Sequence, residues 1–262
     1  NMAILGFIGM GNMGTAMLSG AKDIFGKDNI IFHRSSKEKM EEFSIHEGIA
    51  FKDNNIGVVQ EAKYIILAIK PQMFERVAKE ISEYITDNNI LISLAPGFTV
   101  KQLTEIFKTD RIVRSMPNTP AMVGEGMTGV CFDGDIFSGE EIEDIHKIFE
   151  SVGKMQVVDE KMMNSVVCAS GSSPAYVFMF MEALADSAVK CGMARKDAYT
   201  FVAQTVLGSA KLMLETGKHP AELKDMVCSP GGTTIVGVEQ LEKNGFRKAV
   251  FAATEACFDK CN

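Results

Sequence analysis

Short apolar runs alternate with longer amphipathic stretches over the first part of the chain. The run from Tyr64 to Ile69 is apolar throughout, which is typical of a strand that helices cover on both faces. Further strands are predicted at residues 3–8, 30–33, 90–94, 111–116, 128–132 and 155–158. Helices are predicted at residues 11–25 and 37–47, from Pro71 onward, and at residues 138–151. Strands that alternate with helices favour parallel crossover connections and an α/β sheet.

After about Glu160 the strand pattern ends and helical stretches follow. The first predicted helix begins at Pro174, continues to about Cys191 and is apolar nearly all round. Further helices are predicted at residues 196–216, 233–243 and 246–260. A helix without a polar face must be buried, and a segment of about 100 residues has little interior in which to bury it. We expect burial against a second subunit; the alternative is the central helix of a monomeric bundle.

These patterns predict an α/β protein with two domains. The first, at residues 1–160, is an N-terminal Rossmann dinucleotide-binding domain. The second, at residues 161–262, is an all-helical C-terminal domain for dimerisation and substrate binding.

A glycine motif, Gly9-Met10-Gly11-Asn12-Met13-Gly14, lies between the first predicted strand and helix. In that context Gly9 permits a tight turn, Gly11 lets the backbone approach a pyrophosphate, and Gly14 lets helix and strand pack closely. The helix start then presents unpaired N–H groups to the anion. The motif predicts a dinucleotide site; the alternative is a glycine-rich turn that binds nothing.

The second predicted strand ends without an acidic residue. Sites that prefer NAD place Asp or Glu about 20 residues after the glycines, where it holds the ribose 2′-OH. Here the chain reads Phe32-His33-Arg34-Ser35-Ser36. The Arg34 guanidinium and the Ser35 hydroxyl suit a 2′-phosphate, so we expect NADP, with NADH as a possible second cofactor. The alternative interpretation is an exposed turn, where Arg and Ser are common.

Three later strand ends carry further candidates, because open α/β sheets bind ligands outside the carboxyl ends of their strands. Lys70, followed by Pro71, could contact the cofactor or an acidic substrate, or could simply cap a strand in water. Ala95 belongs to a stretch of small residues that would let a nicotinamide lie close. Asn118, between two prolines, offers a polar group to the same crevice.

The C-terminal part contains a second glycine motif, Ser229-Pro230-Gly231-Gly232-Thr233-Thr234. Two glycines followed by hydroxyls at a helix start form an anion-binding nest with side-chain donors, which would fit a carboxylate. The alternative is an ordinary helix cap, a role that Ser and Thr often take.

Composition excludes several classes of protein. The 262 residues carry a net charge of −7, which argues against non-specific nucleic-acid binding. No apolar run reaches the roughly 20 residues of a membrane span, and no signal peptide is evident. The six cysteines form no Cys-x-x-Cys pair, which favours free thiols in a reducing cytoplasm and no metal site.

Together these motifs resemble the Δ1-pyrroline-5-carboxylate reductase family, over nearly the whole chain. The most specific stretch is residues 223–234, Leu-Lys-Asp-Met-Val-Cys-Ser-Pro-Gly-Gly-Thr-Thr. The stretches at residues 68–71, 116–120 and 170–172 lie in the family's order. The chain departs from the pattern at Ser173, where members often have Gly. It also departs at Met226, where some members use Asn to contact the cofactor across subunits.

The resemblance implies reduction of Δ1-pyrroline-5-carboxylate to L-proline by NAD(P)H, and homodimers formed through the C-terminal helices that can assemble further, for example into a decamer. The implied cofactor contacts are the stretch from Ile8 to Met13, which includes Gly9, Gly11 and Asn12, then Ser35, Asn55, and the stretch from Ala68 to Lys70. The implied substrate contacts are Ser229, Gly232, Thr233 and Thr234.

A mechanism follows from the implied substrate, a cyclic imine with a carboxylate. The nest at Gly231–Thr234 would hold the carboxylate, and Thr234 would hydrogen-bond the ring nitrogen as the catalytic residue. Since Thr is a poor proton donor, it would orient the nitrogen and relay a proton from water. Rivals are a β-hydroxyacid dehydrogenase or imine reductase, which use Lys or Asp where this chain has Ser and Gly before Pro174. A rival of another class is a redox sensor or regulatory binding module, which would require a DNA-binding or partner surface, and this acidic chain shows no basic patch.

Overall fold

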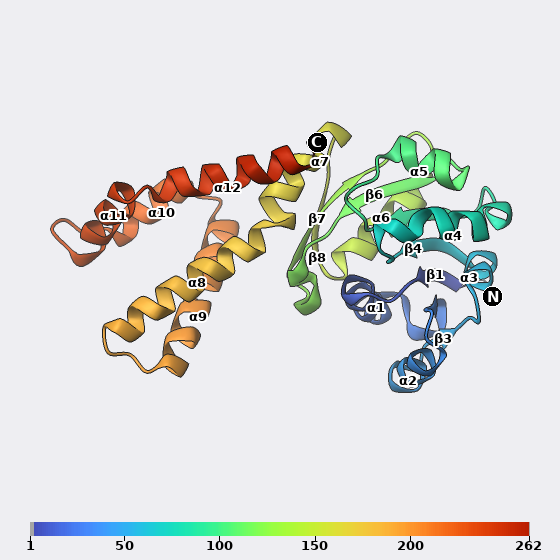
Figure 1. The fold of residues 1–262 in the computed structure, drawn as a ribbon, viewed down its shortest axis with the longest axis horizontal. Coiled ribbons are helices and arrows are strands. Elements are labelled where there is room, and N and C mark those ends of the chain that lie inside the picture. The colour runs from blue at the N-terminus through green and yellow to red at the C-terminus, as the bar shows by residue number, and fades with distance from the viewer. Residues whose placement is uncertain (1–2, 262) are drawn as a thin grey trace. The chain divides into compact units, whose positions relative to one another are not determined.

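The computed structural model describes residues 3–261 (Figure 1). By its internal contacts the chain divides into two compact units, with the division between Ser172 and Ser173. The N-terminal unit contains the sheet and the C-terminal unit consists of helices.

Eight strands form one sheet in the order β3-β2-β1-β4-β5-β6-β7-β8. They are β1 (Ala3–Ile8), β2 (Ile30–His33), β3 (Ala50–Phe51), β4 (Ala62–Leu67), β5 (Ile90–Ser93), β6 (Ile112–Met116), β7 (Gly126–Cys131) and β8 (Gly153–Val157). The strands from β3 to β6 are parallel to their neighbours, β7 is antiparallel to β6, and β8 is parallel to β7. The order reverses at β1, which is the switch point where doubly wound sheets bind ligands.

Helices cover both faces of this sheet. One face carries α1 (Asn12–Phe25), α2 (Lys37–Glu47) and α6 (Gly139–Glu150). The other carries α3 (Asn55–Glu61), α4 (Phe74–Ile81) and α5 (Val100–Phe107). Each face of the sheet has its own apolar core, and alternate residues of a strand point into opposite cores. Phe7 packs in the core under α1, α2 and α6, and its neighbour Ile8 packs in the core under α3, α4 and α5. Short 3-10 segments at residues 27–29, 71–73, 82–84, 119–123 and 160–162 join these elements.

The predicted Rossmann fold is confirmed, with one difference in direction. The alternation of strands and helices favoured parallel crossovers throughout, but β7 returns antiparallel to β6. The physical reason is the length of the connection, because a parallel crossover needs a dozen or more residues. Only residues 117–125 separate the two strands, and they contain a single 3-10 turn, Thr119–Val123.

The segment that follows β8 belongs by its contacts to the N-terminal unit, although its sequence is helical. It comprises a 3-10 turn (Glu160–Met162), α7 (Met163–Val166) and a π-helical turn (Val167–Gly171). An added Cβ at Gly129 of β7 would lie 2.7 Å from Val166 Cγ1, so α7 presses directly on the sheet. The compact units therefore divide 12 residues later than the predicted domain boundary at 160/161.

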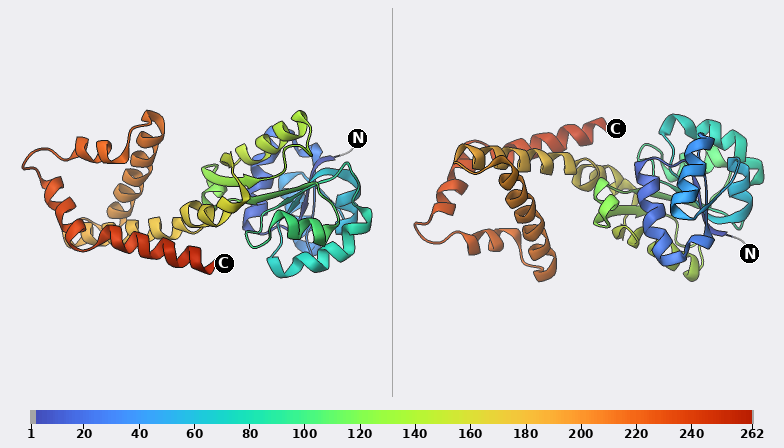
Figure 2. Two further views of the ribbon diagram at one scale, coloured as in Figure 1. Left: turned by 90° about the horizontal axis from the view of Figure 1, so that it is seen from above. Right: turned by 90° about the horizontal axis from the view of Figure 1, so that it is seen from below.

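The C-terminal unit consists of α8 (Ser173–Lys190), α9 (Arg195–Thr216), α10 (Pro220–Val227), α11 (Thr233–Lys243) and α12 (Phe246–Lys260). α8 packs on α9 around Ala185, Ala198 and Val202. α12 runs beside α8 (Figure 2), where the Phe180 and Phe246 ring centroids lie 6.3 Å apart. α9 ends at Gly217, whose left-handed φ of 64° closes the helix as expected for a glycine C-cap.

Within residues 3–261 no helix is both long enough and apolar enough to cross a membrane.

Candidate active site

The glycine loop after β1 has the geometry that its sequence predicts. Gly9 has a φ of +81°, and a Cβ there would lie 2.5 Å from the Ala68 carbonyl oxygen. A Cβ on Gly14 would lie 2.5 Å from Ala68 Cβ. Gly11 differs, because its nearest neighbour would be the Ala68 oxygen at 3.8 Å. The protein's own packing therefore requires glycine at the first and third positions, while Gly11 leaves room for something outside the chain.

The N-terminus of α1 has no side-chain cap. Its N-cap is Gly11, and no acidic residue lies in its first turn. The N-termini of α2, α3, α5 and α6 differ, because each is capped by a side-chain oxygen, from Ser36, Asn54, Thr99 and Ser138 respectively. The free N–H groups at Asn12, Met13 and Gly14 thus form a ready site for an anion.

Arg34 and Ser35 follow β2 at the carboxyl edge of the sheet. Among the residues that the structure describes, no carboxylate pairs with the Arg34 guanidinium; the Arg34 backbone N–H donates to Met40 Sδ at 3.4 Å. Ser35 is exposed, and the next residue, Ser36, caps α2. A half-buried cation beside an exposed hydroxyl suits a phosphate.

Asn55 is buried at the start of α3, with 9% of its surface exposed. Its Nδ2 donates to Glu80 Oε2 at 2.9 Å, while its Oδ1 has no partner in the protein. A buried acceptor without a donor costs free energy, and a ligand hydroxyl would satisfy it.

The turn after β4 approaches the glycine loop, and the end of β5 lies next to the end of β4 in the sheet. The Ala68 N–H donates to the Ile8 carbonyl at 2.9 Å, which holds the turn after β4 against β1. Lys70 and Pro71 are exposed, and no carboxylate among residues 3–261 pairs with Lys70. Ala95 is buried, and its N–H donates to Ser93 Oγ at 3.2 Å.

Asn118 is engaged within the N-terminal unit. Its Oδ1 accepts from the Met127 N–H at 2.8 Å, and its Nδ2 donates to the Ser170 carbonyl at 3.1 Å. The side chain thus ties the end of β6 to β7 and to the π turn. The contact of Asn118 with the cofactor stays a prediction. With these two bonds made, the second hydrogen on Nδ2 is the side-chain donor left for that contact.

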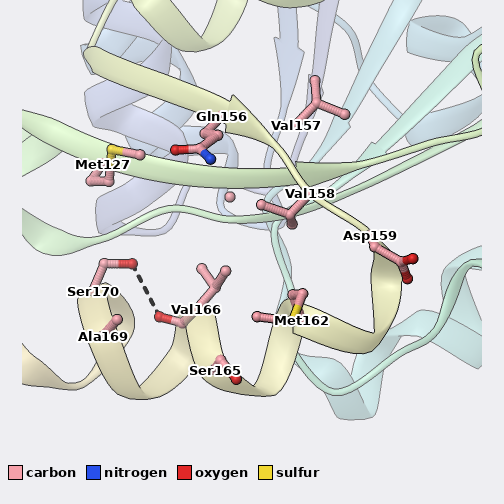
Figure 3. A pocket seen from close by; sticks show the side chains of 11 residues that line it. Met127, Gln156, Val157, Val158, Asp159, Met162, Ser165, Val166, Ala169 and Ser170 are labelled. Atoms are coloured by element: carbon pink, nitrogen blue, oxygen red, sulfur yellow. Dashed lines mark hydrogen bonds between the residues drawn. The ribbon is translucent and has the colours of Figure 1, made fainter.

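Beside this tie lies a cavity of about 600 Å³, between β7, β8 and the helical segment that follows them (Figure 3). Its lining is mostly apolar, with Met127, Val157, Met162 and Val166 among the labelled side chains. Ser170 Oγ donates to the Val166 carbonyl at 3.0 Å, so that hydroxyl bonds within its own helical turn.

The sequence analysis missed Arg114, a buried arginine in β6 near the carboxyl edge of the sheet. Arg114, the third residue of β6, donates from Nη1 to Glu160 Oε1 at 3.0 Å and from Nη2 to the Pro96 carbonyl at 2.8 Å. The sequence feature that could have identified Arg114 is its position inside an apolar strand, just before the predicted turn at Asn118.

The second glycine motif, in the C-terminal unit, repeats the arrangement of the first. Gly232 is the N-cap of α11, no side chain caps that helix, and its first turn has no acidic residue. Gly231 has a φ of +68°, and a Cβ on Gly232 would overlap Ser229 Oγ. Ser229 and Thr233 are exposed and Thr234 is half-buried. A second set of free N–H groups, with hydroxyls beside it, can hold a carboxylate.

The residues of the N-terminal unit fit a dinucleotide. Gly11 leaves space at an uncapped helix start, Asn55 presents an unpaired buried acceptor, and Arg34 lies at the end of β2 where a ribose phosphate would be read. Fold and site thus define a dinucleotide-binding protein of the Rossmann class.

Comparisons with known proteins narrow this class. Residues 160–262 match the family model for pyrroline-5-carboxylate reductase dimerisation, and residues 4–97 match that for NADP oxidoreductases that depend on coenzyme F420. The chain is 46% identical to the pyrroline-5-carboxylate reductase of Escherichia coli, over 98% of this chain and 96% of that protein. It is 37% identical to the Glycine max enzyme of the same name, over 96% and 92% of the two chains. The chain belongs to the pyrroline-5-carboxylate reductase family.

Solved structures agree with this assignment. The Coxiella burnetii pyrroline-5-carboxylate reductase has a TM-score of 0.92 and 30% identity, covering 100% of this chain and 98% of its own. The Plasmodium falciparum pyrroline carboxylate reductase with NADP bound has a TM-score of 0.86 and 33% identity, with the same coverage. A Streptomyces aurantiacus imine reductase, at 15% identity and a TM-score of 0.55, shares the fold alone.

Proposed function

We propose that this chain reduces Δ1-pyrroline-5-carboxylate to L-proline with NADPH. One observation carries the proposal: two helices, α1 and α11, begin at a glycine with no side-chain cap and no acid in the first turn. Two such starts provide one anion site for a dinucleotide pyrophosphate and one for a small carboxylate. The cofactor and the substrate of this reaction have these two anions.

In the N-terminal unit the glycine loop binds the pyrophosphate. The N–H groups of Asn12 and Met13 donate to it, and Lys70 adds a positive charge from the turn after β4. Arg34 and Ser35 contact the 2′-phosphate, and Asn55 accepts a hydrogen bond from a ribose hydroxyl. Ile8, Ala68, Pro71 and Ala95 supply the walls of the site. When bound, NADPH supplies a hydride to the imine carbon.

In the C-terminal unit the start of α11 binds the substrate. The N–H groups after Gly232 and the hydroxyls of Ser229 and Thr233 hold the carboxylate, which orients the ring. Thr234 is half-buried, and its hydroxyl hydrogen-bonds the ring nitrogen. That bond orients the nitrogen and relays a proton to it from water, because the hydroxyl itself is too weak an acid.

Assembly is part of the proposal. The dimerisation family model covers residues 160–262, and α8 exposes large apolar side chains in the single chain. We infer a homodimer formed through the C-terminal helices, with larger rings of dimers, such as a decamer, as a further step. The cytoplasmic location expected from the sequence belongs to the same proposal.

The test measures NADPH oxidation on addition of Δ1-pyrroline-5-carboxylate to the purified chain. Thr234→Ala should lower kcat/KM by roughly 10- to 1000-fold, because it removes a hydrogen-bond donor to the reacting group. Thr233→Ala is the matched control for the fold of α11, and it should raise KM more than it lowers kcat. Unchanged turnover in Thr234→Ala would remove its catalytic role, and no NADPH oxidation by the wild type would refute the function.

A further inference from the structure

Arg114 is a charged residue in the interior of the sheet. Its side chain is 7% exposed, and its Nε has no hydrogen-bond partner in the protein. Burying a guanidinium is costly, and an apolar side chain at such a position often gives equal or greater stability. The fold alone therefore does not explain the charge at this position, which requires a reason in the site.

The contacts of Arg114 meet at the two ends of one loop. Nη2 donates to the Pro96 carbonyl at 2.8 Å, while Nη1 donates to Glu160 Oε1 at 3.0 Å. The same Glu160 oxygen accepts the Val100 N–H at 2.7 Å. The Arg114–Glu160 pair therefore holds the chain from Pro96 to Val100 at both ends. This loop follows β5 directly after Ala95.

Arg111 shows what a purely structural arginine looks like in the same region. It precedes β6 at the opposite, amino edge, where it donates to the Asn89 and Ile136 carbonyls at 3.3 Å each and to Glu141 at 2.6 Å. None of these partners follows a strand at the carboxyl edge. Arg111 is thus a matched control for Arg114.

We propose that Arg114, acting through Glu160 and Pro96, is a positioning residue that sets the loop after β5 against the nicotinamide. This inference rests on the proposed function, in which Ala95 lies beside that ring. Hydride transfer depends steeply on the distance between the two carbons, and a misplacement of about 1 Å can cost a factor of about 100. The phosphate contacts lie elsewhere, at α1 and after β2, so Arg114 affects the chemical step more than cofactor binding.

Arg114→Met tests the proposal by separating kcat from KM. We expect kcat to fall about 10- to 100-fold, with the KM for NADPH changed less than about threefold. NADPH deuterated at the transferred position should show a larger isotope effect on kcat, because hydride transfer then limits the rate. Arg114→Lys keeps the charge but lacks the fixed fork of donors that reaches both partners, and it should lie between. Glu160→Gln combined with Arg114→Met should be no slower than Arg114→Met alone, since the two act as a unit.

Arg111→Met should lower the melting temperature and leave the isotope effect unchanged. Equal kcat in wild type and a folded Arg114→Met, or a larger isotope effect in Arg111→Met as well, would overturn the proposal. If Arg114→Met does not fold, Arg114→Lys and Glu160→Gln replace it in the test, and unchanged kcat and isotope effect in both would overturn the proposal.

Hydrogen exchange at the Val100 amide is independent of catalysis. It should be faster in Arg114→Met than in Arg111→Met, because Glu160 is then held less firmly. If the wild-type protein is inactive, the proposed function fails. Hydrogen exchange at Val100 still tests the role of Arg114, because equal exchange rates in Arg114→Met and Arg111→Met would refute that role.

Discussion

The two units of this protein bury their apolar residues to very different degrees. The N-terminal unit has two well-filled cores, with Phe7, Phe32 and Tyr64 wholly buried. In the C-terminal unit the buried core comprises Ala185, Ala198 and Val202, while on α8 Phe178 is 61% and Met179 68% exposed. An apolar surface of this kind marks an interface. The N-terminal unit therefore covers its apolar residues with its own helices, whereas the C-terminal helices leave an apolar face that a partner chain would cover.

The strongest test of this difference places a charge on α8. Phe178→Glu and Met179→Glu each force a carboxylate into the inferred interface, at a cost of several kcal/mol. The dimer dissociation constant should therefore rise about a thousandfold, and size-exclusion chromatography with light scattering should show monomers. Ile45→Glu is the control, because Ile45 is an isolated apolar residue on α2 that is 85% exposed. An intact assembly in the α8 variants would mean that this face is not the interface.

A second test uses the close packing of the N-terminal unit. Gly14→Ala places a methyl group against Ala68 and should lower the free energy of unfolding by about 1–3 kcal/mol, measured by denaturant titration.

Gly11→Ala is the matched variant in the same loop. Because a Cβ there meets no close neighbour, stability should stay within about 0.5 kcal/mol of wild type. The KM for NADPH should nevertheless rise about tenfold, since the methyl group takes the space of the pyrophosphate. A large stability loss in Gly11→Ala with unchanged KM would reverse the roles assigned to the two glycines.

A third test concerns the charge cluster at the amino edge of the sheet. Burial would raise the pKa of the Glu141 carboxyl, but hydrogen bonds from the Ser138 backbone and Lys63, with the charge of Arg111, lower it below its ordinary value. A lowered folded-state pKa means that the stabilisation is complete above the unfolded value of about 4.3 and disappears as pH falls through the folded-state pKa.

Glu141→Gln should therefore cost about 1–2 kcal/mol near pH 7. Unfolding measured from pH 7 to pH 3 should show this difference constant down to about pH 5 and shrinking below about pH 4. A difference that does not change with pH would mean that Glu141 acts through its shape and not its charge.

The smallest expected effect is at Arg34. Arg34→Ala removes one charge-assisted contact to the 2′-phosphate, so the preference for NADPH over NADH should fall about tenfold, or about 1.4 kcal/mol. The ratio of kcat/KM for the two cofactors measures it. Lys39→Ala, on the exposed side of α2, serves as the control for a general loss of positive charge. A similar fall in both variants would assign the preference to long-range charge.

The sequence predicted most helices and strands within two residues, because their apolar periodicity reflects the cores directly. It missed β3, α3, α5, α7 and α10, which are short and of mixed polarity. The Tyr64–Ile69 run was predicted as one strand, but β4 ends at Leu67, since the turn must bring Ala68 against the glycine loop. The return of β7 could have been foreseen from the ten or so residues available for the connection.

Some residues of the candidate site could be predicted from the sequence and others could not. Motif residues such as Gly9 and Gly14 could be assigned from spacing, because each role is local to one turn. The Arg114–Glu160 pair could not, because its members lie 46 positions apart and meet only in the folded sheet. The internal bonds of Asn118 were likewise invisible to a pattern.

The uneven distribution of buried side chains also bears on how the chain is made. Synthesis runs from the N-terminus, so the ribosome completes the sheet and both of its cores before it begins the helices after Ser172. The N-terminal unit can therefore fold during translation. The helices after Ser172 have only a small core of their own and emerge later, so the exposed apolar side chains of α8 stay uncovered until a second chain is available. Two chains made by neighbouring ribosomes on one messenger RNA would meet sooner than chains released separately.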